Sequence, residues 1–302
     1  MTIKCTQTPA HFHLDNESAY QAWRNSKLFC YETGYQSSAI KIANINQLTA
    51  HEHARIKQQI RQYNIAFYRL CNANKNQAAV PGKLASQLGL LKPDKHLCGD
   101  DSGLSQIKVR KKRSIGEYIP YTNHAINWHT DGYYNSDDKK IHSMILHCES
   151  SAMVGGNNAF IDHELIYILL RDENPDYIRA LSHKDTMLIP ENRQHNILIR
   201  PKQSGPVFSF CPWGLHMRYT ARTKSIAWRD DVVTQRAVER IREIHNDDSI
   251  YKIKHRLQPG EGVVSNNILH MRTGFTDNEN KRLLYRIRFY QPLLLNDSGF
   301  EL

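Results

Sequence analysis

Hydrophobic positions recur at helical spacing early in the chain. Within the segment 51–67, Ile56, Ile60 and Tyr63 lie on one face of a helix. The apolar run 66–70 that follows has the length and composition of a short strand. A helix that passes directly into a strand is therefore expected here.

A second helix is predicted over residues 80–88. Gly89 stands just beyond it, at the position where many helices end in the left-handed conformation that glycine adopts easily. We therefore treat residues 1–106 as an N-terminal lead-in made of helices and strand.

From Ile107 onward the pattern changes to short apolar runs bounded by turn residues. These runs predict strands at 115–119, 141–148, 159–161, 207–210, 262–265 and 283–290. Two helical segments interrupt them: one covers 164–170 and continues after Pro175 through 177–181, and the other covers 234–245. Asp162 and Thr234 are the expected N-caps.

Many short strands with inserted helices predict a mainly β fold, with a double-stranded β-helix (jelly roll, cupin-like) core flanked by α-helices. The length of 302 residues is compatible with one domain, 1–302. Its jelly-roll core is expected at 107–292, followed by a tail at 293–302.

The composition of the chain bears on where in the cell the protein is expected. Hydrophobic residues make up 40% of the chain and charged residues 23%, as in ordinary globular proteins. No apolar run approaches the roughly 20 residues that cross a bilayer, and the first residues do not resemble a secretory signal. The six cysteines form no CxxC pair. We expect a cytoplasmic protein with reduced cysteines and no membrane partner.

The net charge of +10 raises the question of an acidic partner. The densest basic run comprises Lys108, Arg110, Lys111, Lys112 and Arg113. No helix-turn-helix, zinc-finger or RNA-binding aromatic motif accompanies it, so the run is interpreted as a solvated strand end or loop. Nucleic acid is not the expected partner.

The chemistry-bearing pattern is the run Trp128–Gly132. Alternation along a strand would send His129 and Asp131 to the same face. His270, about 140 residues later, would complete a set of two histidines and one carboxylate. Such a facial triad leaves three iron positions open: two for a bidentate 2-oxo acid and one for dioxygen. An isolated HxD is weak evidence in a chain with 16 histidines, so context is needed.

The context resembles the taurine dioxygenase superfamily, and within it most closely the gamma-butyrobetaine hydroxylase and clavaminate synthase-like members. The matching segments occur in order over roughly residues 50–292: Trp128–Gly132, Leu146–Cys148, Gly155–Asn158 with Asp162, His270–Phe275 and Arg282–Arg286. The resemblance implies iron(II), 2-oxoglutarate and O2 as cofactor and cosubstrates, with His129, Asp131 and His270 as the catalytic metal ligands.

The resemblance also assigns the anchor of the cosubstrate. The far carboxylate of 2-oxoglutarate requires a permanent, bidentate cation, and Arg282 follows the distal histidine by about a dozen residues. Arg286, four residues further and expected on the same strand face, shares that task or binds an anionic substrate. Asn158 occupies the place of a side chain that assists the same carboxylate in relatives.

Substrate contacts are assigned by the same resemblance. Tyr133 follows the metal motif in a loop, and Arg218 and Arg222 lie in a segment that lines the pocket of relatives; Arg286 is the remaining candidate. The sequence departs from the family at Ser265, where many relatives have asparagine, and at Met271, where glycine is usual. The clustered cysteines of the small zinc module of gamma-butyrobetaine hydroxylase are missing, so carnitine biosynthesis is not implied.

The resulting hypothesis is a dioxygenase that hydroxylates a small polar, amino-acid-like or anionic metabolite and releases succinate and CO2. Three alternatives stay open: the same core acting on a protein or nucleic acid, a non-catalytic basic binding module on a jelly-roll scaffold, and a zinc hydrolase with the same ligands. A homo-oligomer is compatible with the sequence.

Overall fold

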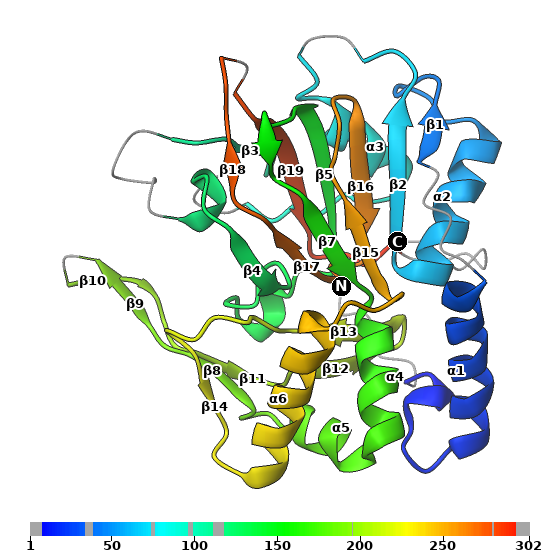
Figure 1. Ribbon diagram of the computed structural model, residues 1–302, viewed down its shortest axis with the longest axis vertical. Coiled ribbons are helices and arrows are strands. Elements are labelled where there is room, and N and C mark those ends of the chain that lie inside the picture. The colour runs from blue at the N-terminus through cyan, green and yellow to red at the C-terminus, as the bar shows by residue number, and fades with distance from the viewer. Residues whose placement is uncertain are drawn as a thin grey trace. The chain divides into compact units, whose positions relative to one another are not determined.

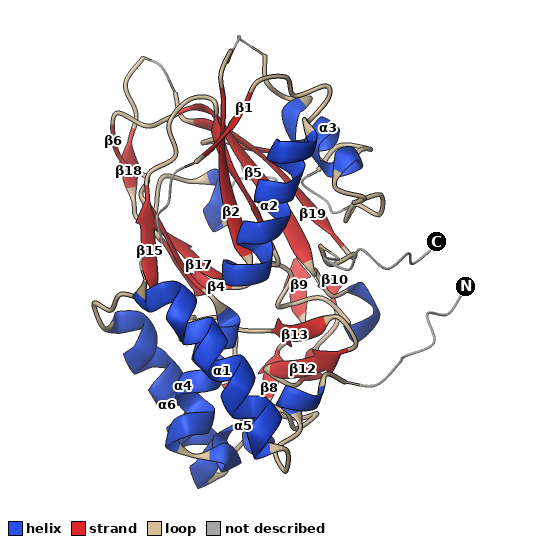
Figure 2. Ribbon diagram, turned by 90° about the vertical axis from the view of Figure 1, so that its right-hand side faces the viewer, coloured by secondary structure: helices blue, strands red, loops and turns tan. Residues whose placement is uncertain are grey.

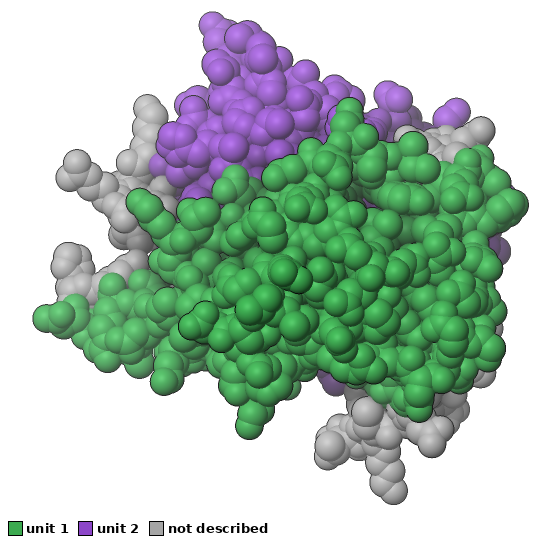
Figure 3. Space-filling model, turned by 60° about the horizontal axis from the view of Figure 1, so that its bottom comes forward, with its two compact units in different colours: residues 1–35, 127–140, 160–253 green, residues 36–126, 141–159, 254–302 purple. Residues whose placement is uncertain are grey.

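The computed structural model describes residues 8–33, 39–73, 76–95, 99–110, 118–194, 196–279 and 281–293. The chain divides into two compact units, coloured separately in Figure 3. Unit 1 comprises residues 1–35, 127–140 and 160–253, and unit 2 comprises 36–126, 141–159 and 254–302. Within the described part of the chain, no helix has the length and apolar character needed to span a membrane.

Unit 2 is built on a six-stranded sheet with the order β1-β2-β16-β5-β19-β3 (Figure 1). Its strands are β1 (Ile40–Ile42), β2 (Ile65–Leu70), β3 (Ser105–Ile107), β5 (Ser143–Ser150), β16 (Glu261–Ser265) and β19 (Leu283–Phe289). β1 pairs with β2 in parallel, and the other neighbours are antiparallel. A small antiparallel pair, β6 (Val154–Gly155) and β18 (Phe275–Thr276), belongs to the same unit.

Two helices cover one face of this sheet, as Figure 2 shows: α2 (Ala50–Tyr63) and α3 (Val80–Gln87). Ile56 and Ile60 of α2 and Leu84 of α3 are buried in one apolar cluster with the sheet, which confirms the helical face inferred from the sequence. A capping box formed by Thr49 and Glu52 begins α2. Gly89 follows α3 with a φ of +75°, as predicted.

Unit 1 contains the helices α1 (Glu17–Glu32), α4 (His163–Glu173), α5 (Pro175–Leu181) and α6 (Val232–Asn246). Unit 1 also contains the short strands β8 (Met187–Ile189), β9 (Asn192–Gln194), β10 (Ile197–Arg200), β11 (Gln203–Gly205), β12 (Phe208–Cys211), β13 (Gly214–Met217) and β14 (Ala227–Trp228). They form one three-stranded sheet, β11-β8-β14, and the two hairpins β9–β10 and β12–β13.

A four-stranded sheet with the order β15-β7-β17-β4 completes the strand arrangement. Its strands are β4 (Ile126–His129), β7 (Asn158–Ile161), β15 (Lys252–His255) and β17 (Leu269–Arg272). Successive long strands alternate between this sheet and the six-stranded one: β4 is followed by β5, and β15, β16 and β17 alternate in the same way. Such alternation is the winding of a jelly roll, so the predicted fold class is confirmed.

Two local predictions are wrong. Thr234 is not an N-cap, because the Asp231 carboxylate accepts hydrogen bonds from the Thr234 N–H (2.9 Å) and hydroxyl (2.6 Å). α6 therefore begins at Val232, ahead of the apolar pattern. Ile119 opens the 3-10 helix Ile119–Tyr121 instead of ending a strand, since Pro120 has no N–H to donate to a ladder.

The helix α1 was not predicted at all. Several sequence predictions fall outside the described residues, namely 115–117 of the expected strand, Lys111–Arg113 of the basic run, and the tail after Leu293. The single-domain division stays a prediction.

Candidate active site

The first two predicted ligands lie in a backbone segment that is fastened to its neighbour within unit 1. β4 ends at His129. The N–H of Thr130 donates to the carbonyl of Tyr219 (3.0 Å), and the N–H of Tyr219 donates back to the Thr130 hydroxyl (3.1 Å). The N–H of Ala221 donates to the carbonyl of Trp128 (2.8 Å). The backbone on both sides of His129 is therefore held in place.

Asp131 lies in the turn after β4, not on the strand itself. Strand alternation consequently does not place it, contrary to the reasoning from the sequence. Gly132 follows with a φ of +70°, a conformation that glycine adopts without strain. Asp131 is only 5% exposed. A carboxylate at this depth needs a cation or hydrogen-bond donors to compensate for lost hydration.

The two histidines share one hydrogen-bonding pattern. Nδ1 of His129 lies 2.8 Å from the carbonyl of Asn127, and Nδ1 of His270 lies 2.8 Å from the carbonyl of Ile268. A carbonyl only accepts, so Nδ1 carries a proton in both rings, and Nε2 is the nitrogen that can serve as a metal ligand. Metal-ligating histidines are commonly oriented in this way.

His129, Asp131 and His270 form a group that can hold a metal ion. The nitrogen and oxygen atoms that they offer all lie within 4.8 Å of one another. β4, which ends at His129, and β17, which carries His270, are hydrogen-bonded neighbours in the four-stranded sheet. Two imidazoles and one carboxylate are a ligand set that fits iron(II) and leaves coordination positions open.

The predicted cosubstrate anchor lies in unit 2 beside the double-glycine turn. The N–H of Gly156 donates to the carbonyl of Gly274 (3.1 Å). A Cβ on Gly155 would come within 2.2 Å of that carbonyl, and one on Gly156 would meet Nε of Arg282 at 3.3 Å. These two glycines therefore let the turn pack closely against the segment that follows β17 and against the Arg282 side chain.

Arg282 and Asn158 line the same small cavity of unit 2, together with Cys148, Gly156, Arg256 and Leu284. Arg282 is 4% exposed, and its Nη1 has no hydrogen-bond partner among the described residues. Burial lowers the pKa of Arg282 to about 10, so it stays charged at neutral pH. Oδ1 of Asn158 likewise has no partner within the described ranges. A buried, uncompensated guanidinium of this kind suits an anionic ligand.

Arg286 differs from Arg282 in its setting. It is half-buried within β19, opposite Leu146 of β5 and Ser105 of β3. Arg282 precedes β19, and the register shifts between Leu283 and Leu284. The alternation of side chains between the two faces of a strand therefore cannot be counted from Arg282 to Arg286, and the expectation that both lie on one strand face is not supported. The role of Arg286 stays a prediction.

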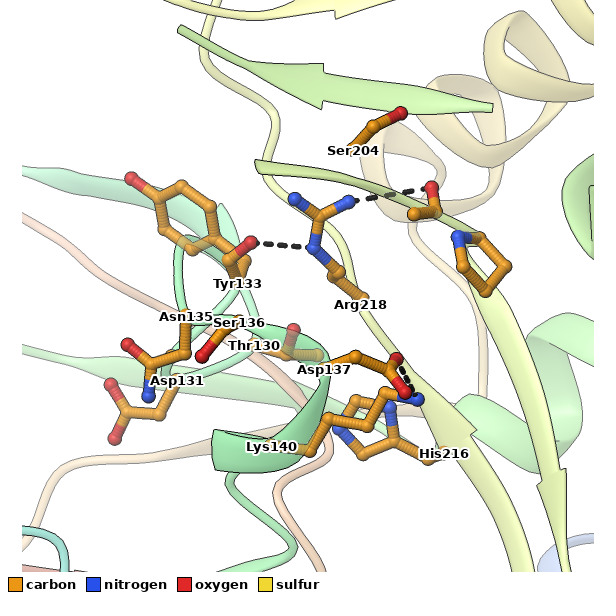
Figure 4. Close-up of a pocket in the computed structure, with 13 residues that line it drawn as sticks. Thr130, Asp131, Tyr133, Asn135, Ser136, Asp137, Lys140, Ser204, His216 and Arg218 are labelled. Atoms are coloured by element: carbon orange, nitrogen blue, oxygen red, sulfur yellow. Dashed lines mark hydrogen bonds and ion pairs between the residues drawn. The ribbon is translucent and has the colours of Figure 1, made fainter. Parts of the chain in front are cut away.

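Arg218 donates its hydrogen bonds to backbone carbonyls of the protein, and Figure 4 shows two of them. Nε donates to the carbonyl of Tyr133 (2.7 Å), Nη1 to those of Met187 (2.9 Å) and Gly205 (3.4 Å), and Nη2 to that of Gln203 (3.2 Å). Burial lowers the pKa of Arg218 to about 10. Arg218 fastens the loop after Asp131 to β8 and β11, and its nitrogens are already occupied.

Tyr133 and Arg222 are close to each other in unit 1. Nη1 of the exposed Arg222 donates to the Tyr133 hydroxyl (3.1 Å), and the Tyr133 ring lies edge-on to that of His129, with centroids 6.5 Å apart. Both residues stay predicted substrate contacts.

Reasoning from the sequence missed one residue, Arg272. It stands two positions after His270 on β17 and is 3% exposed. The signal that could have revealed it is strand alternation, which puts residues i and i+2 on one face.

Comparison with known proteins identifies the relatives of this site. Residues 31–288 match the family described as "Taurine catabolism dioxygenase TauD, TfdA family". A uridine-5'-phosphate dioxygenase from Streptomyces sp is 28% identical over 186 residues, which are 59% of this chain. The match spans 66% of that relative, slightly less than two thirds of its length.

Two solved structures share the fold. An asparagine oxygenase in complex with Fe(II), a hydroxyasparagine and succinate superposes with a TM-score of 0.60 at 13% identity, covering 89% of this chain and 91% of that one. The non-haem iron oxygenase OrfP, in complex with Fe and alpha-ketoglutaric acid, gives 0.60 at 12% identity with the same coverage.

Proposed function

Because the chain belongs to the taurine catabolism dioxygenase TauD, TfdA family, we propose that His129, Asp131 and His270 hold the iron(II) on which its activity depends. The enzyme is a 2-oxoglutarate-dependent non-haem iron oxygenase that uses iron(II), 2-oxoglutarate and O2. The observation that carries the assignment of the ligands is the approach of their nitrogen and oxygen atoms to within 4.8 Å of one another.

The chain's own residues have separate tasks in this proposal. Bound iron supplies the oxidative decarboxylation of 2-oxoglutarate to succinate and CO2, coupled to oxidation of the substrate. His129 and His270 present Nε2, because their Nδ1 protons are held by the carbonyls of Asn127 and Ile268. Asp131 offsets part of the metal charge.

Arg282 anchors the far carboxylate of 2-oxoglutarate, and Asn158 assists it. The support is the burial of both side chains around one cavity, with an unpartnered donor on Arg282 and an unpartnered amide oxygen on Asn158. A guanidinium stays protonated at the pH of the reaction and can grip a carboxylate with two parallel bonds.

The substrate is a small anionic or zwitterionic metabolite, which is oxidised beside the metal. Relatives with this fold include enzymes named for a nucleoside monophosphate and for an amino acid. Both classes carry an anionic group, and unit 2 offers more buried cationic groups than the cosubstrate anchor requires. Nucleotides and amino acids are therefore the two classes to screen.

The test is succinate release by purified protein with iron(II), 2-oxoglutarate and air. We expect slow release without substrate, and faster release with one member of a panel of nucleoside monophosphates and amino acids. No cosubstrate binding and no succinate above the metal-free control would contradict the proposal.

A further inference from the structure

We propose that Arg272 binds an anionic oxygen group, a phosphate or a carboxylate, of the primary substrate, separately from the Arg282 site for the cosubstrate. This inference rests on the proposed function, because it names the substrate contact of the same site. It concerns a residue that lies two positions from a metal ligand.

Arg272 has an incomplete set of hydrogen bonds. Its Nη2 donates to the carbonyls of Thr122 (3.0 Å) and His124. Nε and Nη1 are buried and have no partner among the described residues. Three of the five N–H donors of a guanidinium reside on those two nitrogens. Burying these donors without acceptors is costly, and an anion would satisfy both the donors and the charge.

Arg282, the proposed cosubstrate anchor, is also buried and also has a nitrogen without a hydrogen-bond partner among the described residues. The guanidinium carbon of Arg272 lies 4.8 Å from the centre of the Phe275 ring, and that of Arg282 lies 5.0 Å from it. The two guanidinium carbons are therefore within about 10 Å of each other. Both side chains are almost fully buried, and the structure gives neither guanidinium an ion pair among the described residues. Two like charges at this distance repel each other, and bound anions would relieve that repulsion.

Arg288, a third buried arginine of unit 2, provides a contrast. Its Nη2 forms an ion pair with Asp94, a residue that also accepts a hydrogen bond from the Tyr290 hydroxyl (2.5 Å). Arg288 is thus paired with a carboxylate, whereas neither Arg272 nor Arg282 forms an ion pair among the described residues.

Two observations assign Arg272 to the substrate instead of the cosubstrate. Arg282 lines the cavity that it shares with Asn158, whereas Arg272 is not among the residues that line it. Alternation along β17 puts Arg272 on the same face as His270. The group to be oxidised must lie beside the metal, so a cation next to a metal ligand is well situated to hold the substrate.

The experiment measures binding of inorganic phosphate and of acetate to protein loaded with Mn(II) and saturated with 2-oxoglutarate, at constant ionic strength. Mn(II) shortens the ³¹P or ¹³C relaxation times of nuclei close to it, so the readout reports anions near the metal. The variants are Arg272→Gln and Arg272→Lys, with Arg179→Gln as control, since Arg179 is 60% exposed and lies on α5.

We expect wild type and Arg179→Gln to bind at least one of the two anions, and Arg272→Gln to bind it at least about tenfold more weakly. Arg272→Lys keeps a charge and should show intermediate affinity. The affinities for Mn(II) and 2-oxoglutarate should stay unchanged in both variants, and whether phosphate or acetate binds more tightly identifies the substrate's anionic group.

Three results would overturn the inference: neither anion binds to wild type, Arg272→Gln binds as wild type does, or its defect falls on Mn(II) or 2-oxoglutarate affinity instead. The last result would make Arg272 a positioning residue for the loop that contains Thr122 and His124. Succinate release without Arg272-dependent anion binding contradicts this inference alone. Arg272-dependent anion binding without any succinate contradicts the proposed function alone.

Discussion

Arginine side chains have opposite hydrogen-bonding patterns in the two units: Arg218 follows β13 in unit 1, whereas Arg272 ends β17 and Arg282 precedes β19 in unit 2. Arg218 donates from all three nitrogens to backbone carbonyls. Arg272 and Arg282 are equally buried but have nitrogens with no hydrogen-bond partner in the described part of the chain. Burial lowers the pKa of all three, so burial alone does not separate them. The completeness of their hydrogen bonds does, and from it we infer that Arg218 is a framework residue and that Arg272 and Arg282 bind ligands.

The largest expected effect is on His129, the proposed metal ligand beside Thr130, whose backbone is hydrogen-bonded to Tyr219, the residue after Arg218. His129→Ala should reduce iron-dependent succinate release by at least about a thousandfold, because one of three ligands is lost. The comparison enzyme is His51→Ala, which removes an exposed histidine of α2 and should be as active as wild type. Succinate release by His129→Ala at the rate of wild type would refute the ligand assignment.

Arg218→Gln tests the framework side of the comparison. It leaves the buried carbonyl of Met187 and the partly buried carbonyls of Tyr133 and Gln203 without their donor, so the free energy of unfolding should fall by about 4 kcal/mol. Denaturant unfolding measures this loss, with Arg193→Gln, an exposed arginine, as the control. Unchanged stability together with weaker anion binding would assign Arg218 to a ligand.

Arg282→Gln tests the ligand-binding side. The concentration of 2-oxoglutarate that gives half-maximal succinate release should rise about a hundredfold, because a charge-assisted bidentate pair is lost. The unfolding free energy without ligand should not fall, since the variant removes an uncompensated buried charge. A strong loss of stability with unchanged cosubstrate affinity would place Arg282 among the framework residues.

His147 is a buried residue of unit 2 whose two ring nitrogens both have hydrogen-bond partners, so it serves as a framework residue for comparison with Arg272 and Arg282. Its Nδ1 accepts from the Tyr68 hydroxyl (3.0 Å) and its Nε2–H donates to Oε1 of Gln77 (2.6 Å). Burial lowers the pKa of His147 from 6.5 to about 4. The unfolded chain therefore binds a proton between these values that the folded chain does not.

The contribution of His147 to stability is fully present above pH 6.5 and is lost as the pH falls towards 4. We expect about 3 kcal/mol of pH dependence in this window that His147→Gln does not show. Denaturant unfolding at several pH values for both proteins measures it. Parallel pH profiles would contradict the assignment of a neutral, fully hydrogen-bonded His147.

The sequence identified residues whose roles depend on local spacing or on a family pattern. The helical face of Ile56 and Ile60 and the glycine after α3 belong to this group. The three predicted metal ligands stay a prediction, and their nitrogen and oxygen atoms lie within 4.8 Å of one another. The roles of Arg218 and Arg272 could not be read from the sequence, because they depend on which carbonyls lie nearby. Tyr133 is 85 residues from Arg218, and Thr122 is 150 residues from Arg272. Only the folded chain brings such partners together.

The most direct test of the account is an anaerobic titration of the iron(II)-loaded protein with 2-oxoglutarate, followed by the visible charge-transfer absorption of a metal-chelated 2-oxo acid. The account predicts a saturable band for wild type, no band for His270→Ala, and a band for Arg282→Gln only at much higher 2-oxoglutarate. A wild-type protein that binds iron(II) but gives no band, or a His270→Ala variant that gives the full band, would contradict it.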